Sequence, residues 1–176
     1  MYTHGHVDHV GGSGAIVADG RARGHRNPMV VGHENVQARF ERYRATDGWN
    51  RSINERQFGG ARRAGPAMLD GERFLPDDVA ECSSTFRDRS GLRVGDLRIE
   101  LRHARGETDD HAWAWIPDHG AVVVGDFLVW AFPNAGNPQK VQRYPGEWAA
   151  ALREMAALGP ELLLPAHGLP IGGRQR

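Results

Sequence analysis

The stretch His4–His9 constrains this chain more than any other, because its sequence, HGHVDH, gathers metal-ligand side chains within six residues. Residues two apart do not face each other on a helix, but they point the same way in an extended or looping segment. His4 and His6 can therefore share one metal ion through neutral imidazole nitrogens. Asp8 and His9 are adjacent and diverge, which suits a second metal ion nearby. The alternative is an exposed polar N-terminus with adventitious metal affinity.

Further ligand-type side chains follow expected strands, in the segments 106–111 (GETDDH), 122–126 (VVVGD) and 163–168 (LLPAHG). Taken singly, Asp126 is more often a cap or turn residue, and Glu107 and His167 have equally ordinary explanations. Loop residues positioned by rigid strands are, however, the usual way to build a site. The HGHVDH stretch followed by these three segments, in this order, predicts a metal centre.

Hydrophobic periodicity predicts a mixed α/β chain. A hairpin is expected over residues 92–104, turning at Gly95-Asp96, and further strands are expected over residues 28–33, 112–116, 121–124 and 161–164. Amphipathic helices are expected over residues 34–46 and from about 146 to 158. Asp47-Gly48 is expected to end the first helix. Residues 49–90 lack periodicity and predict a long excursion with a short strand near residues 68–74.

Composition narrows the class of protein. The 176 residues suit one domain, and the balance of 22 basic and 22 acidic side chains argues against a general nucleic-acid binder. The single cysteine, Cys82, can form neither an intrachain disulfide nor a cysteine-based zinc cluster. No apolar run approaches the roughly 20 residues of a membrane span, and we expect no signal peptide in the chain as given. We therefore expect neither a nucleic-acid nor a membrane partner. The cellular compartment is left open, with the cytoplasm as the default expectation.

The order of the motifs resembles the metallo-β-lactamase superfamily. That family shows a His-x-His-x-Asp-His loop, a Gly-His-Thr-type loop, a strand-end aspartate and a strand-end histidine. The resemblance implies an αββα sandwich and two zinc ions, with iron or manganese as alternatives. It implies that one metal is held by His4 and His6, that both are bridged by Asp126, and that the second is held by Asp8, His9 and His167.

One position departs from the common pattern. Where most of the family has histidine in the second loop, this chain has Glu107, whose carboxylate can also ligate zinc. Glutamate here is similar to the alkylsulfatase branch, whose dinuclear zinc site uses carboxylates where relatives use histidine. His111 is the competing ligand, or else a residue behind the site that orients a ligand.

The resemblance implies a dinuclear zinc-dependent hydrolase of small-molecule esters, most of all alkyl sulfates, acting through a hydroxide between the metals. Asp8 and Asp126 are the expected catalytic carboxylates, and Asp8 could orient the nucleophile or shuttle its proton. Asn134, Lys140 and Arg143 could hydrogen-bond sulfate oxygens. The competing interpretation of these three is a solvated loop with ordinary surface charge.

Other functions compete with this one. The same residues serve hydrolysis of a lactone, thioester or phosphodiester, and a diiron redox centre is a further class, which His6 disfavours because diiron members generally carry glutamate within the first motif. In the family, several strands and a helix precede the first motif. The expectation is therefore one partial domain over residues 1–176, an incomplete sandwich whose activity or homodimer belongs to a longer parent, or an inactive fragment.

Overall fold

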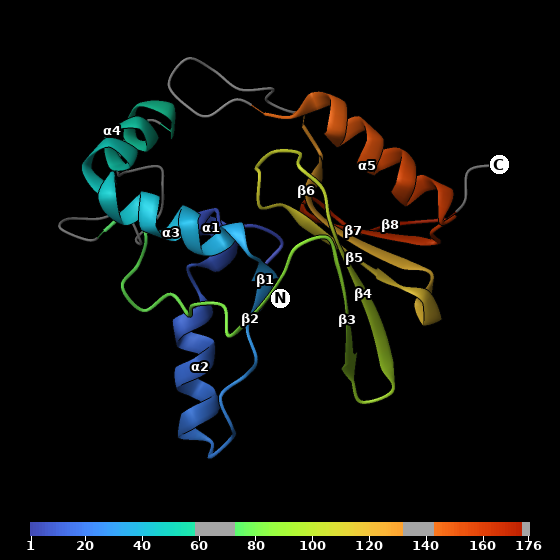
Figure 1. The fold of residues 1–176 in the computed structure, drawn as a ribbon, viewed down its shortest axis with the longest axis horizontal. Helices are drawn as coiled ribbons and strands as arrows, with labels where there is room; N and C mark the ends of the chain where they lie inside the picture. Colours follow the sequence, from blue (N-terminus) through green and yellow to red (C-terminus); the bar gives the residue numbers. More distant parts are fainter. Residues whose placement is uncertain (59–72, 132–142, 174–176) are drawn as a thin grey trace.

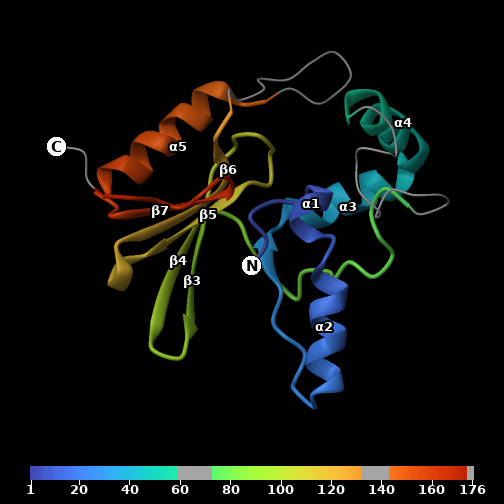
Figure 2. The same cartoon turned by 180° about the vertical axis from the view of Figure 1, so that it is seen from behind.

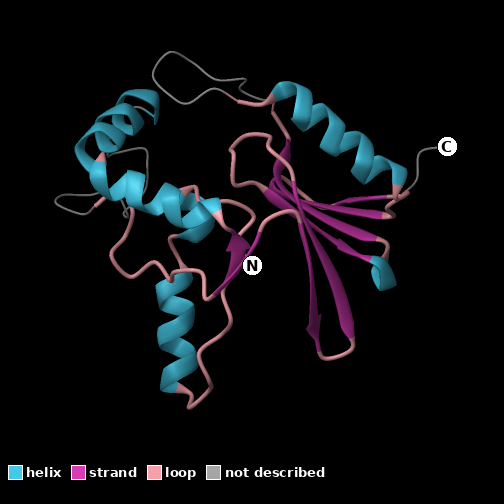
Figure 3. Ribbon diagram, in the orientation of Figure 1, coloured by secondary structure: helices cyan, strands magenta, loops and turns pink. Residues whose placement is uncertain are grey.

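The computed structural model describes residues 1–58, 73–131 and 143–173. Its helices and strands are mixed along the chain (Figure 3). The helices are α1 (Val7–Val10), α2 (Ser13–Ala22), α3 (Asn35–Ala45), α4 (Asp47–Phe58) and α5 (Pro145–Ala157), with a 3-10 turn, η2 (Pro117–His119). The strands are β1 (Val31–His33), β2 (Ser84–Phe86), β3 (Arg89–Val94), β4 (Leu97–His103), β5 (Ala112–Ile116), β6 (Ala121–Val129), β7 (Leu162–His167) and β8 (Ile171–Gly172).

Two sheets stack between two helical layers. The six-stranded sheet has the order β3-β4-β5-β6-β7-β8, and the smaller sheet pairs β1 with β2 in parallel. Helix α5 covers one side of the large sheet, while α1 to α4 lie beyond the small one (Figures 1 and 2). Side chains of both sheets meet in one buried cluster that includes Val31, Phe86 and Leu101. The layers follow the expected order, αββα.

The large sheet is antiparallel from β3 to β6, and its order follows from short turns. Val94 pairs with Leu97, so Gly95-Asp96 forms the two-residue hairpin turn that the sequence predicts. Gly95 has φ 59°, a left-handed conformation that glycine adopts without steric cost. Strand β7 runs parallel to β6, which requires a crossover, and α5 lies in that connection.

Helix α5 buries the apolar stripe that its sequence predicts. Trp148 and Met155 are buried, with Leu152 and Leu158 packed at the edge of the same cluster. They face the sheet residues Trp113, Val122, Val124 and Phe127. The indole N–H of Trp148 donates to the Phe127 carbonyl at 2.8 Å, which satisfies a polar group that burial would otherwise strand.

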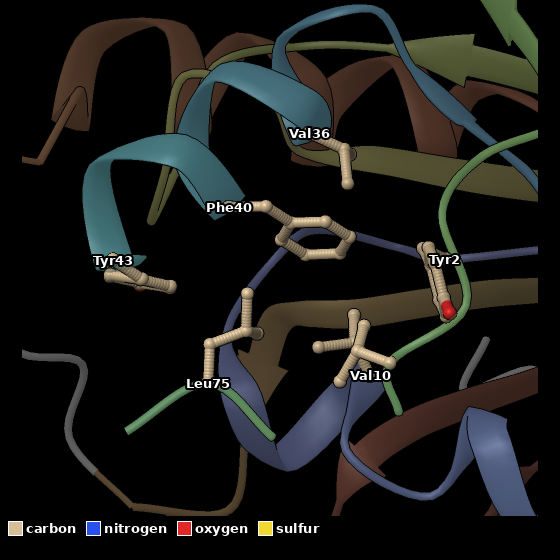
Figure 4. Close-up of a cluster of buried hydrophobic side chains, with 7 residues drawn as sticks. Tyr2, Val10, Val36, Phe40, Tyr43 and Leu75 are labelled. Carbon is tan, nitrogen blue, oxygen red and sulfur yellow. The ribbon is translucent and has the colours of Figure 1, made fainter. Parts of the chain in front are cut away.

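A second core lies among the N-terminal elements (Figure 4). Helix α3 contributes Val36, Phe40 and Tyr43, spaced by three and four residues so that they share one face. Tyr2 and other buried side chains complete the cluster, namely Val10, Leu75 and Val79. The start of the chain, through Tyr2, is therefore part of a hydrophobic core.

Several predicted boundaries are wrong. Helix α2 was not expected, and it has no fully buried residue from which an apolar stripe could be recognised. Helix α3 ends at Ala45, close to the expected end, but a second helix, α4, begins at Asp47 where a loop was expected. The Asp47 carboxylate accepts the N–H of Phe74 at 2.6 Å. Strand β2 lies inside the predicted excursion. Of the strand expected near residues 68–74, residues 73–74 are not in a strand and the rest fall outside the described residues. No helix in the described ranges is long and apolar enough to span a membrane.

Candidate metal centre

The first residues of the chain are fixed between the two sheets. The N–H of Tyr2 donates to the Val31 carbonyl at 2.8 Å, and the Thr3 carbonyl accepts from Ala112 in β5 at 2.6 Å. The Tyr2 hydroxyl donates to the Ala80 carbonyl at 2.7 Å. Chain ends fray unless they are tied down in this way. The residues that lead into the HGHVDH stretch are therefore bonded to both sheets.

The HGHVDH stretch presents its histidines as expected. Residues 4–6 are not helical, and α1 begins only at Val7. His4 is fully buried, and its Nε2 lies 2.9 Å from Nδ1 of His6. Asp8 and His9 lie in the short helix α1, and their side chains meet beside the His4–His6 pair. Oδ2 of Asp8 is 3.3 Å from Nε2 of His9.

The structure brings all seven predicted ligands into two adjacent groups. One ligand atom from each member of a group lies within 4.8 Å of the others. The first group is His4, His6, Glu107 and Asp126, and the second is Asp8, His9 and His167.

Asp126 lies between the groups because of an irregularity in β6. The sequence placed it at a strand end, but β6 continues to Val129, and its register against β7 shifts around Gly125. Gly125 has φ 54°, and a Cβ there would lie 2.8 Å from both Thr3 Cβ and His111 Nε2. Such irregularities re-aim a side chain. Asp126 Oδ1 lies 3.3 Å from His9 Nε2, while its Oδ2 lies 3.9 Å from His4 Nε2.

Burial and neighbouring charges set the protonation of the histidines. Burial lowers the pKa of His4 to about 4, which leaves its imidazole neutral at pH 7. Burial also opposes the charged form of His9, but the carboxylates of Asp126 and Asp8 outweigh it and raise the pKa of His9 to about 10. A cation is therefore favoured beside His9, and a bound metal ion would take the place of that proton.

Three buried ligand atoms of the converging groups have no hydrogen-bond partner in the described part of the chain: His9 Nε2, Glu107 Oε2 and Asp126 Oδ1. A buried polar atom left unpaired costs about 1–3 kcal/mol. Imidazole with carboxylate is a donor set that zinc accepts and that iron or manganese also tolerates. The residues fit a divalent metal centre.

His111 lies behind the site rather than among the converging groups. It is fully buried, and its Nε2 accepts the backbone N–H of Asp126 at 3.3 Å. Burial lowers the pKa of His111, so the neutral ring that can accept this hydrogen bond is favoured. This position agrees with the expected orienting residue, a role that stays a prediction.

The predicted substrate-binding residues are less well placed by the structure. Asn134 and Lys140 lie outside the described residues. Arg143 is described, and its guanidinium contacts Glu107: one nitrogen donates to the Glu107 carbonyl at 2.6 Å and the other lies 2.5 Å from Oε1.

Sequence reasoning missed a buried ion pair that holds the HGHVDH stretch. Asp110 is fully buried; its Oδ2 accepts the N–H of Gly5 at 2.9 Å, and its Oδ1 accepts from Nε of Arg39 at 3.0 Å. Arg39 also pairs with the more exposed Asp109. A signal was present, since Arg39 stands on the apolar face of its helix, where a charge demands a partner.

An αββα fold with histidine and carboxylate side chains gathered in two candidate ligand groups defines a class of metal-binding proteins. The chain belongs to the metallo-beta-lactamase superfamily, whose family model matches residues 1–167.

Individual relatives are more distant. The linear primary-alkylsulfatase of Pseudomonas sp. (strain ATCC 19151) is 23% identical over 190 residues, covering 100% of this chain and 35% of its own length. The structure of the stereoselective inverting sec-alkylsulfatase Pisa1 from Pseudomonas sp. superimposes with a TM-score of 0.72 at 18% identity, covering 98% of this chain and 29% of that one. A di-iron-bound form of TTHA1623 has a TM-score of 0.55 at 22% identity, with coverages of 97% and 69%. The chain thus spans about a third of the alkylsulfatases.

Proposed function

We propose that the chain carries the metal centre of a dinuclear zinc-dependent hydrolase that cleaves alkyl sulfate esters. The observation that carries the proposal is the Asp126 carboxylate, whose two oxygens face different groups of ligands. The relatives named as alkylsulfatases support the substrate class. Glu107 supports it further through the family resemblance, which implies carboxylate ligands in the alkylsulfatase branch.

Each side chain has a defined part in this proposal. One metal would be held by His4, His6 and Glu107, the other by Asp8, His9 and His167, with Asp126 shared. Bound zinc would lower the pKa of water to about 7 and polarise the ester.

Asp8 is the residue best placed to move a proton. Its side chain is 54% exposed, so water and substrate can reach it. Burial alone would raise the pKa of the Asp8 carboxyl, but the charge of His9, whose Nε2 lies 3.3 Å from Oδ2, holds the pKa well below its usual range. At neutral pH Asp8 is therefore a carboxylate, and the oxygen that does not face the metal could orient an attacking water and accept its proton. His167 Nε2 lies 3.2 Å from Oδ2 of Asp8, so the two side chains converge on the same place.

The first test is elemental analysis of the purified chain without added metal, followed by assays on four esters: an alkyl sulfate, a lactone, a thioester and a phosphodiester. We expect two zinc ions per chain and the highest kcat/KM on the alkyl sulfate. Two zinc ions with preference for another ester would keep the centre but replace the substrate class. Two iron ions, the metal content of one similar structure, would favour the diiron redox class instead. A folded chain without metal would refute the proposal.

A further inference from the structure

Arg143 makes a two-point contact with Glu107. The Arg143 side chain is only 12% exposed, and the residue lies two positions before the start of helix α5. The guanidinium bonds the Glu107 carbonyl at 2.6 Å and lies 2.5 Å from the carboxylate oxygen Oε1. Contact with both main chain and side chain fixes the rotamer of Glu107 as well as its charge, because the planar guanidinium presents its donors in a rigid geometry.

The contact distinguishes the two oxygens of Glu107. Oε1 is taken by Arg143, whereas Oε2 is buried, has no hydrogen-bond partner in the described ranges, and faces the ligand group. Oε2 lies 3.4 Å from Nε2 of His4 and 3.3 Å from Nδ1 of His6. The side chain can therefore offer one oxygen, as a histidine offers one nitrogen.

The charge balance points the same way. The two ligand groups already contain the carboxylates of Asp8 and Asp126, and Glu107 adds a third negative charge at a position where histidine would add none. Like charges held close together repel, and low local dielectric increases that repulsion. The guanidinium of Arg143 offsets the added charge at its source.

We propose that Arg143 is a positioning residue that makes Glu107 equivalent to a histidine ligand: it neutralises the extra charge and leaves Oε2 as the single metal-facing atom. This rests on the proposed metal centre. It competes with the expectation that Arg143 hydrogen-bonds sulfate oxygens. Arg143 and Glu107 then form one unit, so that the need for arginine exists only while position 107 is glutamate.

The test is a double-mutant cycle of wild type, Arg143→Gln, Glu107→His and the double variant. Zinc affinity at each site is measured by competition with a chromophoric chelator, and folding is checked by thermal unfolding of the metal-free chains. We expect Arg143→Gln to weaken one of the two sites by about 10–100-fold, the effect typical of groups that orient a ligand. In the Glu107→His background the same change should cost less than about 3-fold, because the carboxylate that Arg143 orients is no longer present.

Two further variants sharpen the result. Arg143→Lys keeps the charge without the two-point geometry, and should recover only part of the lost affinity. Arg105→Gln is the matched control. Arg105 pairs with the half-exposed Glu147, so this substitution removes a nearby arginine–glutamate pair that lies outside the ligand groups. It should leave both zinc affinities unchanged.

Three outcomes would overturn the inference. Equal losses from Arg143→Gln in the wild-type and Glu107→His backgrounds would show that Arg143 acts independently of Glu107. Unchanged zinc affinities with a raised KM for an alkyl sulfate would return Arg143 to substrate binding. If the wild-type chain folds and binds no zinc, the proposed function fails first, and this inference falls with it.

Discussion

The two halves of the proposed metal centre are built in opposite ways. One half is the continuous HGHVDH stretch, whereas the other half is three single residues from separate segments at the edge of the large sheet, Glu107, Asp126 and His167. The continuous half is conspicuous in the sequence, but its position depends on a few long-range bonds, notably from Asp110. The scattered half is inconspicuous, but Asp126 and His167 stand on neighbouring, hydrogen-bonded strands. Density of a motif in sequence therefore says little about what holds it in place.

The largest effect on the HGHVDH half should come from Asp110→Asn. This change removes the charge facing Arg39 while leaving the arginine buried, and breaking a buried pair costs about 3–5 kcal/mol. Denaturant unfolding of the metal-free chain measures the loss. The control is Asp109→Asn, since the Asp109 side chain is 43% exposed and its pairing with Arg39 should contribute no more than about 1 kcal/mol. Similar losses for both variants would contradict the proposed anchor.

The same pair predicts a dependence on pH. Burial alone would raise the pKa of the Asp110 carboxyl, but the guanidinium of Arg39 and the Thr108 hydroxyl hold the pKa below its usual value. The unfolded chain then binds more protons in this range, so stability falls as the pH falls. The advantage of wild type over Asp110→Asn should be full above about pH 4, the usual pKa of an unfolded aspartate, and shrink below it. An advantage that persists undiminished at lower pH would show that the charge of Asp110 is not its source.

On the sheet half, Asp126→Asn should weaken zinc binding at both ligand groups, because its two carboxylate oxygens face different groups. An amide binds metal more weakly than a carboxylate and carries no charge, so we expect zinc affinity to fall by more than the roughly 100-fold upper range of groups outside the ligand set. Metal content after dialysis gives the measurement. Asp96→Asn, in the exposed hairpin turn, should retain full metal content. Retention of two zinc ions by Asp126→Asn would remove it from the shared position.

The smallest expected effect is that of Tyr2→Phe, which deletes one hydrogen bond to the Ala80 carbonyl and keeps the buried ring. The free energy of unfolding should fall by about 1 kcal/mol. Zinc affinity should change little, because the main-chain bonds of Tyr2 and Thr3 remain. A loss of metal without a loss of stability would mean that the hydroxyl sets the ligand geometry.

The features that could be predicted from the sequence are those that depend on residues close together in the chain. The spacing of His4 and His6 and the Gly95-Asp96 turn are local, and the structure contains both. The order of motifs predicted the αββα fold through a family resemblance. The Arg39–Asp110 pair joins residues 71 apart, and no local pattern states which carboxylate an arginine will meet. Helix α2 was not predicted, because amphipathic patterning detects only helices that bury one face.

The bond from Gly5 to Asp110 has a consequence for the time course of folding. It closes a loop of 105 residues, whereas the strands of the large sheet from β3 to β6 pair with sequence neighbours. Long loops carry a larger entropic cost of closure, and nonlocal contacts form slowly. The sheet should therefore form early and the N-terminal residues dock late. The nitrogen ligands of the first group would then reach the carboxylates only in the final step, so the metal centre matures after the scaffold that receives it.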